Sequence, residues 1–198
     1  MGSIAIVVLV IVLALLVWAV LIYNRLVRSR QMAAEGWSGI DVQLKRRADL
    51  VPNLVETVRG YATHEQDLFT RVTELRNQAR AAPAGDVAAR APIEGMLSAT
   101  IGRLLAVAEN YPQLKADGTF LQLQEQLATL ENEIQMARRY YNGTARDLNV
   151  LIESFPSNLV ASSFGFTKRD FFEIEDARDR AVPSVSFGTG TRPPAGRS

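Results

Sequence analysis

Few side chains in this 198-residue sequence have the type and spacing that catalysis or metal binding needs. The one histidine, His64, stands in the string HEQD, and an imidazole can act as a general base or metal ligand because it titrates near neutral pH. The zinc-protease pattern HExxH requires a second histidine at position 68, which is leucine. We therefore expect His64 to be a structural or surface residue.

Two other groups of polar residues could bind a ligand. The run of Lys45, Arg46 and Arg47 could hold a phosphate or an anionic lipid, but a solvated helix face with a Lys45–Asp49 pair at i, i+4 is the simpler expectation. The string YYN (140–142) could line a peptide groove. Its simpler interpretation is that Tyr141 packs in a core with its hydroxyl bonded.

Composition excludes several function classes. Cysteine is absent, so the chain has no disulfide, thiolate metal site or thiol nucleophile. The 22 Lys and Arg balance 21 Asp and Glu to a net charge of +1, which disfavours nucleic-acid binding. The sequence also shows no Gly-rich phosphate loop and no Ser-His-Asp set. We expect no cofactor, no metal and no enzymatic activity.

The elements that position these groups begin with an apolar run. After a short N-terminus (1–3), residues 4–23 carry no charge and are long enough to cross a hydrocarbon core of about 30 Å. Trp18 and Tyr23 stand toward its end, where interfacial aromatics are favoured. Three arginines follow: Arg25, Arg28 and Arg30. We expect a transmembrane helix with its N-terminus outside and the following domain in the cytoplasm. A cleaved signal peptide fits less well, because Met-Gly-Ser lacks a positive charge and the run is too long.

A helical seam begins at Trp37. Steps of three and four residues from there to Ala79 meet thirteen positions, of which eleven are apolar or aromatic. This is the seam that a bundle or coiled-coil helix buries, and its register continues across Pro52 and Gly60. We expect one helix kinked at Pro52, whose ring deprives the Ala48 carbonyl of its partner, so that a side chain or water should satisfy it.

Two alternatives remain open for this helix. It could hinge or break near Gly60, and Thr63 with Gln66 could form a capping box for a restart.

Arg47 and Glu65 are the charged residues on the seam, and buried charges need partners. Possible partners are Asn142, Asn149, Arg138 and Glu131. The simpler expectation is that the seam edge is exposed and both side chains reach water.

The remaining sequence predicts further helices. Residues 80–92 have the composition of a turn, a helix follows from 93 to about 110, and 111–118 reads as another turn. A helix then spans 119–155, and its seam of five heptads runs from Phe120 to Phe155, before Pro156. The fold class is all-α: a transmembrane helix and an antiparallel bundle of three to four long helices over 24–182. Either 81–92 is helical or the first helix splits near Gly60.

The C-terminal part of the sequence has a different character. Aromatic residues in 155–173 are separated by small and turn-forming residues, and we expect them to fold back and cap an open end of the core. They are Phe155, Phe164, Phe166, Phe171 and Phe172. Residues 183–198 are rich in Pro, Gly, Ser and Thr and are expected to be a disordered tail.

Four strings resemble the LemA family closely and in order. They are WSGIDVQLKRRADLVPNLVETVRGYATHE (37–65), AENYPQLKADGTFLQLQEQL (108–127), ARRYYNGTARDLNVLIESFPSNLVA (137–161) and the FGF and FFE pieces at 164–166 and 171–173. The resemblance implies a bacterial, single-pass protein of the cytoplasmic (inner) membrane with an N-terminal anchor and a helical-bundle domain. It implies no catalytic mechanism.

Together these observations predict a non-enzymatic, membrane-anchored scaffold or interaction protein that associates with copies of itself. The alternative is a module that binds a peptide or a client membrane protein, and an enzyme is the remote one. The candidate interaction or structural residues are Arg47, Pro52, Asn53, Glu65, Tyr140, Tyr141, Asn142, Phe155, Phe164, Phe166, Phe171 and Phe172.

Overall fold

The computed structural model describes residues 2–83 and 85–173. Within these residues the fold is all-α, as predicted, with no strand. The helices are α1 (Gly2–Arg59), α2 (Gln66–Ala81), α3 (Val87–Ala108), α4 (Pro112–Lys115), α5 (Gly118–Glu153) and α6 (Ser157–Ser163). The expected tail at 183–198 lies outside the described residues.

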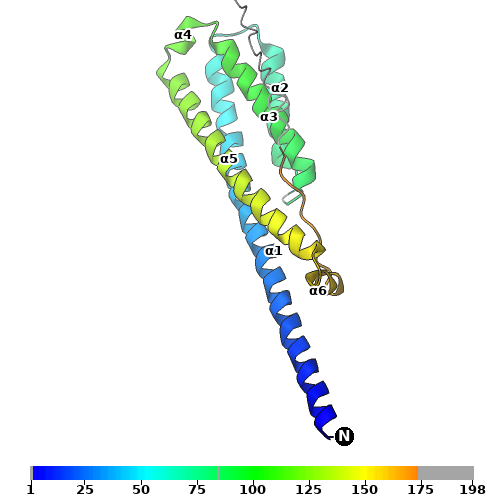
Figure 1. Ribbon diagram of the computed structural model, residues 1–198. Coiled ribbons are helices and arrows are strands. Elements are labelled where there is room, and N and C mark those ends of the chain that lie inside the picture. Colours follow the sequence, from blue (N-terminus) through cyan, green and yellow to red (C-terminus); the bar gives the residue numbers. More distant parts are fainter. Residues whose placement is uncertain (1, 84, 174–198) are drawn as a thin grey trace, which may run out of the picture.

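Helix α1 is one unbroken element of 58 residues, about 87 Å long at 1.5 Å per residue. Its first third extends alone as a rod (Figure 1), with nearly every side chain from Gly2 to Leu21 exposed. From Leu26 onward it buries one stripe at steps of three, four and seven residues. The stripe is formed by Leu26, Ala33, Ile40, Leu44, Arg47, Val51, Leu54 and Val58. The same helix therefore carries both the apolar segment and one wall of the bundle.

Helix α1 ends at Arg59 and α2 starts at Gln66. The prediction of one continuous helix past Gly60 is therefore wrong, and the alternative of a helix break near Gly60 is confirmed. The apolar register survived because α2 folds back onto α1 and faces the same core. The restart is not at Thr63 either. The residue that caps α2 is Glu65, whose side chain makes no capping hydrogen bond.

Pro52 lies inside α1, as predicted. The carbonyl of Ala48, four residues earlier, accepts a hydrogen bond of 2.8 Å from Nε of Arg76 on α2. A side chain on the neighbouring helix thus replaces the backbone donor that proline lacks. The sequence prediction that a side chain or water would satisfy this carbonyl is confirmed.

The turn between α2 and α3 is shorter than predicted. Helix α3 starts at Val87, six residues before the predicted start, because Asp86 caps it by accepting from the backbone N–H of Ala89 at 2.9 Å. Both alternatives for the lengths therefore hold in part: the first helix splits, and residues 87–92 are helical. The bundle has four long members, in the order α1, α2, α3 and α5, with consecutive members antiparallel (Figure 1).

Among residues 2–83 and 85–173, two helices, α1 and α3, are long and apolar enough to cross a membrane by length and composition. The apolar window of α1 is fully exposed, whereas α3 packs within the bundle against α2 and carries the buried charges of Arg90 and Glu94. Of these two helices, α1 is the one whose apolar window packs against no other element. It therefore fits a membrane anchor, and α3 is a core helix.

Helix α6 and the chain after it form the final layer. Gly165 has a φ of +68°, and the N–H of Phe166 bonds the carbonyl of Ala161 at 3.0 Å, a pattern that ends a helix and reverses the chain. Residues 166–173 then run back along α5 (Figure 1). Phe172 is fully buried midway along the bundle, while Phe155, Phe164 and Phe171 are exposed. The segment thus lies lengthwise on the bundle, which corrects the expectation of a cap at one end.

Candidate functional site

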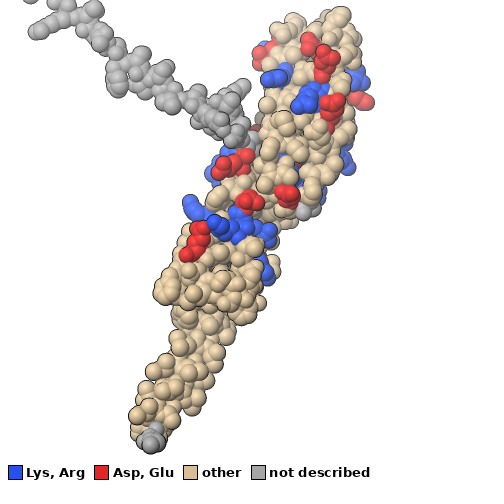
Figure 2. All heavy atoms as spheres, turned by 90° about the vertical axis from the view of Figure 1, so that its right-hand side faces the viewer, with Lys and Arg blue, Asp and Glu red and all other residues tan. Residues whose placement is uncertain are grey.

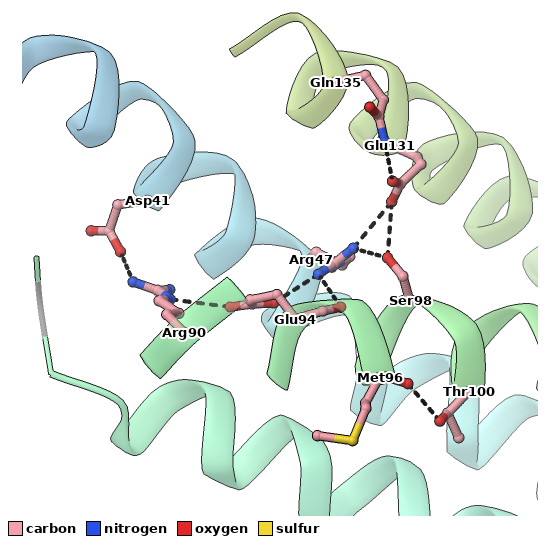
Figure 3. Close-up of polar contacts among 9 residues, drawn as sticks. All are labelled: Asp41, Arg47, Arg90, Glu94, Met96, Ser98, Thr100, Glu131 and Gln135. Carbon is pink, nitrogen blue, oxygen red and sulfur yellow. Dashed lines mark hydrogen bonds and ion pairs between the residues drawn. The ribbon is translucent and has the colours of Figure 1, made fainter. Parts of the chain in front are cut away.

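A buried set of charges joins α1, α3 and α5 (Figure 3). We call the side chains of Asp41, Arg47, Arg90, Glu94, Ser98 and Glu131 the charge network. Its centre is Arg47, only 2% exposed, whose guanidinium donates to Glu94 Oε2 at 2.7 Å, to the Glu94 carbonyl at 3.2 Å and to Glu131 Oε2 at 3.1 Å. It also donates to the hydroxyl of Ser98. One side chain of α1 thereby contacts both facing helices.

The second guanidinium of the network belongs to Arg90 of α3. Its Nε donates to Glu94 Oε1 at 3.2 Å, and its Nη1 donates to the carboxylate of Asp41 on α1. Its charged end also lies 5.9 Å from the centre of the Trp37 ring. Glu94, 1% exposed, therefore accepts from two arginines at once.

Burial of these charges is tolerated because each has a partner of opposite sign. The three carboxylates of the network meet two guanidiniums, and Lys45 adds a third cation at 2.6 Å from Asp41. Burial alone would raise the pKa of Asp41, but the hydrogen bonds from Lys45 and Arg90 outweigh it and hold that pKa below its usual value. The network therefore links the three helices through matched charges.

The sequence prediction for Arg47 was wrong in its simpler form, since the side chain does not reach water. Of its proposed partners only Glu131 contacts it. Glu94 and Arg90 were not predicted as partners, although the sequence holds a signal for them. Steps of three and four residues backward from Leu97 reach these two positions on the buried face of α3.

The predicted Lys45–Asp49 pair is also wrong. Lys45 bonds Asp41, one turn earlier on α1, and Asp49 instead pairs with Arg80 of α2 at 3.0 Å. The basic run therefore divides its roles, with Arg47 inside the bundle and Lys45 and Arg46 on its surface.

A second polar site holds the C-terminal segment against α5. Asn149 donates from Nδ2 to the Arg169 carbonyl and accepts from the Arg169 N–H at Oδ1, both at 2.8 Å. Asn142 does the same for Phe172, at 3.2 Å and 2.9 Å. The Tyr141 hydroxyl donates to the Asp170 carbonyl at 2.8 Å. We call Tyr141, Asn142 and Asn149 the amide clamp.

The spacing of the amide clamp follows from backbone geometry. Asn142 and Asn149 are seven residues apart, about 10.5 Å along a helix, and three extended residues from 169 to 172 span about 10 Å. Each asparagine therefore meets one backbone N–H and carbonyl, as a neighbouring strand would. The side-chain contact that distinguishes this segment from other backbone is made by Phe172, whose ring lies 5.6 Å from that of Trp37 in the core formed with Tyr141.

The sequence interpretation of YYN is settled for two of its residues. Tyr141 is buried with its hydroxyl bonded, as the simpler interpretation predicted, and burial raises its pKa. Asn142, first considered as a partner for Arg47, binds backbone instead, as does Asn149. Tyr140, by contrast, is exposed.

The other candidates lie apart from both sites. Asn53 and His64 are exposed, and Arg138 is half-buried on α5. Glu65 is half-buried on an open depression of about 610 Å³ between α2 and α3, together with Asp67, Leu68, Arg71, Thr100, Arg103, Ala106, Val107 and Asn110. Among the described residues no cluster of His, Asp and Glu could hold a metal ion. The hydrogen bonds and ion pairs of the two sites join parts of the chain to one another.

Comparison with known proteins identifies the family of the chain. The model of the LemA family matches residues 36–187, more than half of the sequence, and the match includes the charge network and the amide clamp. The chain belongs to the LemA family.

Similar proteins are bacterial. Magnetosome protein MamQ of Magnetospirillum gryphiswaldense is 24% identical over 184 residues, with 81% of this chain and 68% of that protein covered. Magnetosome protein MamQ 1 of Paramagnetospirillum magneticum is 25% identical with the same coverage. Protein LemA of Metamycoplasma hominis is 26% identical over 155 residues, covering 77% of this chain and 69% of that protein. Together with the apolar N-terminal helix, these relatives fit a bacterial membrane protein.

Proposed function

We propose that this LemA-family protein is a non-enzymatic scaffold of the bacterial cytoplasmic membrane, which holds a rigid helical bundle at a fixed position relative to the bilayer. The observation that carries the proposal is the continuity of α1, which runs without a break from the exposed apolar segment into the bundle core. A helix that belongs to both parts leaves no flexible linker between them.

The polar groups support the same role. The carboxylates and guanidiniums of the charge network form contacts between helices. The donors and acceptors of the amide clamp bind the chain's own backbone. Groups bonded in this way position the helices rather than a substrate. The open depression beside Glu65 lies apart from both sites, so their groups do not line it as the reactive groups of an enzyme line a pocket.

Self-association is the finer part of the proposal. The seams that suggested it are buried within the chain, so copies would meet through the anchor, whose apolar side chains are exposed all round. Because the chain has no cysteine, single cysteines placed from Ala5 to Tyr23 allow disulfide cross-linking of the full chain in membranes. We expect cross-linked dimers on one helical face. Monomers at every position, together with a monomeric mass in detergent by light scattering, would contradict self-association.

A second candidate function is peptide binding, which the amide clamp favours. Two asparagines that bind backbone and one aromatic pocket would accept any extended segment with a phenylalanine at the right position. A peptide with the sequence of residues 166–173 can be titrated against the full-length Phe172→Ala variant, whose own segment lacks the ring. Binding would support this function, and its absence at millimolar peptide would exclude it.

The orientation of the anchor is proposed from the three arginines after Tyr23, which favour a cytoplasmic bundle. A C-terminal alkaline phosphatase fusion, active only outside the cytoplasm, should be silent. An active fusion would place the bundle on the other side of the membrane.

A further inference from the structure

The end of the bundle nearest the anchor exposes large apolar side chains. Phe155 is 79% exposed, Leu159 on α6 is 56% exposed and Phe164 is 64% exposed. Single exposed apolar residues are common on proteins, but these three lie on or directly beside one seven-residue helix. They therefore form a surface feature that needs an explanation.

This feature lies at the level where α1 leaves its apolar run. The ring of Phe164 is centred 4.9 Å from that of Tyr23, the last residue of the run, and the ring of Phe166 lies 5.9 Å from it. On its inner face α6 packs Val160 and Ala161 into one core cluster with Leu26 of α1. Helix α6 is thus held beside residues 22–26 of the anchor helix.

Charged side chains mark the same level. Figure 2 shows that, on the face it displays, a band of basic and acidic side chains crosses the bundle, and below it a widened uncharged surface continues into the rod of α1. Arg30 places its guanidinium 5.2 Å from the centre of the Phe166 ring, and Lys168 pairs with Glu153 at 2.7 Å. Aromatic rings next to basic groups are the composition of a membrane interface.

We infer that α6 and the residues beside it form a second membrane contact, in which Phe155, Leu159 and Phe164 lie in the interfacial region of the bilayer that α1 enters. The inference rests on the proposed membrane anchor. The bilayer is the occupant that the geometry favours, because Tyr23 fixes the depth of Phe164 and the uncharged surface below the charged band is continuous with the anchor helix.

Fluorescent labelling of the full chain tests this inference, since the cysteine-free sequence allows one label per variant. Leu159→Cys carries an environment-sensitive nitrobenzoxadiazole label in vesicles of phosphatidylcholine and phosphatidylglycerol. The vesicles contain no spin label, lipids spin-labelled near the headgroup, or lipids spin-labelled deep in the acyl chain, the depth expected for residue 12. Val12→Cys reports on the anchor. Thr129→Cys, which is exposed on α5 and lies about 36 Å of helix away from Glu153, reports on the aqueous part.

We expect the label at 159 to emit at shorter wavelength than the label at 129 and to lose at least half of its intensity to the spin-labelled lipid. Unquenched, water-like emission at 159 with quenching at 12 would overturn the membrane contact and leave the anchor intact. An unquenched label at 12 would overturn the anchor itself. Short-wavelength emission at 159 without quenching would show that protein covers α6, which also overturns the inference.

A serine variant gives an independent readout. With the label at Ser163→Cys, Phe155→Ser with Leu159→Ser should reduce lipid quenching at least twofold. The matched control replaces two exposed apolar residues of α5 far from α6, Leu121→Ser with Met136→Ser, and should leave quenching unchanged. Equal quenching in both variants, with helical content retained, would contradict a role for these apolar side chains.

Discussion

The charge network and the amide clamp both hold elements of the bundle together, but they do so with different chemistry. The network joins three helices through side chains of opposite charge, of which Arg47, Arg90 and Glu94 are buried and Glu131 is 41% exposed, so each member depends on the identity of the others. The clamp joins one helix to an extended segment through neutral amides and backbone groups, so most positions of the segment tolerate any residue. The first arrangement fixes which helix faces meet, and the second holds a segment that we expect to be releasable without unfolding of the helices.

The largest effect is expected at the centre of the network. Glu94→Ala leaves two buried guanidiniums without their shared carboxylate, and we expect it to lower the free energy of unfolding by about 3–5 kcal/mol. Urea unfolding of the full chain in detergent, followed by circular dichroism, measures this loss. The control is Glu131→Ala, whose side chain is 41% exposed and should cost about 1 kcal/mol or less. Similar losses in both variants would show that burial does not govern the network.

A compensated variant sharpens the same test. Arg47→Met, Arg90→Met and Glu94→Leu together remove the innermost charges without leaving one of them unpaired, while Asp41 and Glu131 keep access to water. We expect the triple variant to be more stable than Glu94→Ala, because replacing a buried ion pair by apolar residues is often neutral. A triple variant less stable than the single one would mean that the network contributes more than charge compensation.

The next effect concerns the C-terminal segment. Phe172→Ala removes a fully buried ring, a change that costs about 3–5 kcal/mol in a core. We expect the segment to detach while the helices stay folded, exposing Trp37 and shifting its fluorescence to longer wavelength in a Trp18→Phe background. Phe171→Ala, at the exposed neighbouring position, should leave the emission unchanged. A loss of helical content in Phe172→Ala would show instead that the segment is part of the cooperative core.

A smaller effect is expected at the clamp amides. Asn142→Ala should weaken the hold on Phe172 by about 1 kcal/mol, which is roughly fivefold faster hydrogen exchange of its N–H. Asn149→Ala should do the same for the N–H of Arg169. Exchange measured by NMR or mass spectrometry tests both, with Asn132→Ala, exposed on the same helix, as the control. Unchanged exchange rates would contradict the prediction that these asparagines stabilise the bound segment.

The smallest effect is the response to acid. Because its partners lower the pKa of Asp41 in the folded protein, its contribution to stability is fully present above the unfolded value of about 3.9 and is lost as the pH falls through the lower folded value. Stability should therefore stay level from pH 7 to about 5 and decline below about 4. Asp41→Asn should be less stable at neutral pH and show a shallower decline. An unchanged acid response would exclude Asp41 as a contributor.

The apolar seams predicted most of the fold because a buried stripe at steps of three and four residues has few other interpretations. The seams did not reveal the helix break at Gly60. Two helices that fold onto one core can keep the same three-four register when the loop between them happens to have a matching length. The start of α3 was missed because Ala-rich composition resembles a turn, although Asp86 stood in position to cap it.

The candidate sites were harder to predict. The burial of Arg47 depends on Glu94 lying opposite it. The distance between these two side chains is set by how α3 packs against α1, and no local sequence motif encodes that packing. The roles of Asn142 and Asn149 depend on where the chain returns after Gly165, which no periodicity encodes. Tyr141 was predicted correctly because its position on the α5 seam already implied burial.

The unbroken α1 also has a mechanical consequence. From Tyr23 to Arg59 it extends about 54 Å beyond the anchor, and a tilt of about 20°, an average value for membrane helices, displaces its far end sideways by about 18 Å. Membrane thickness influences that tilt. If the proposed anchor tilts in this way, a small change in tilt at the bilayer would be amplified into a larger displacement at the far end of the bundle.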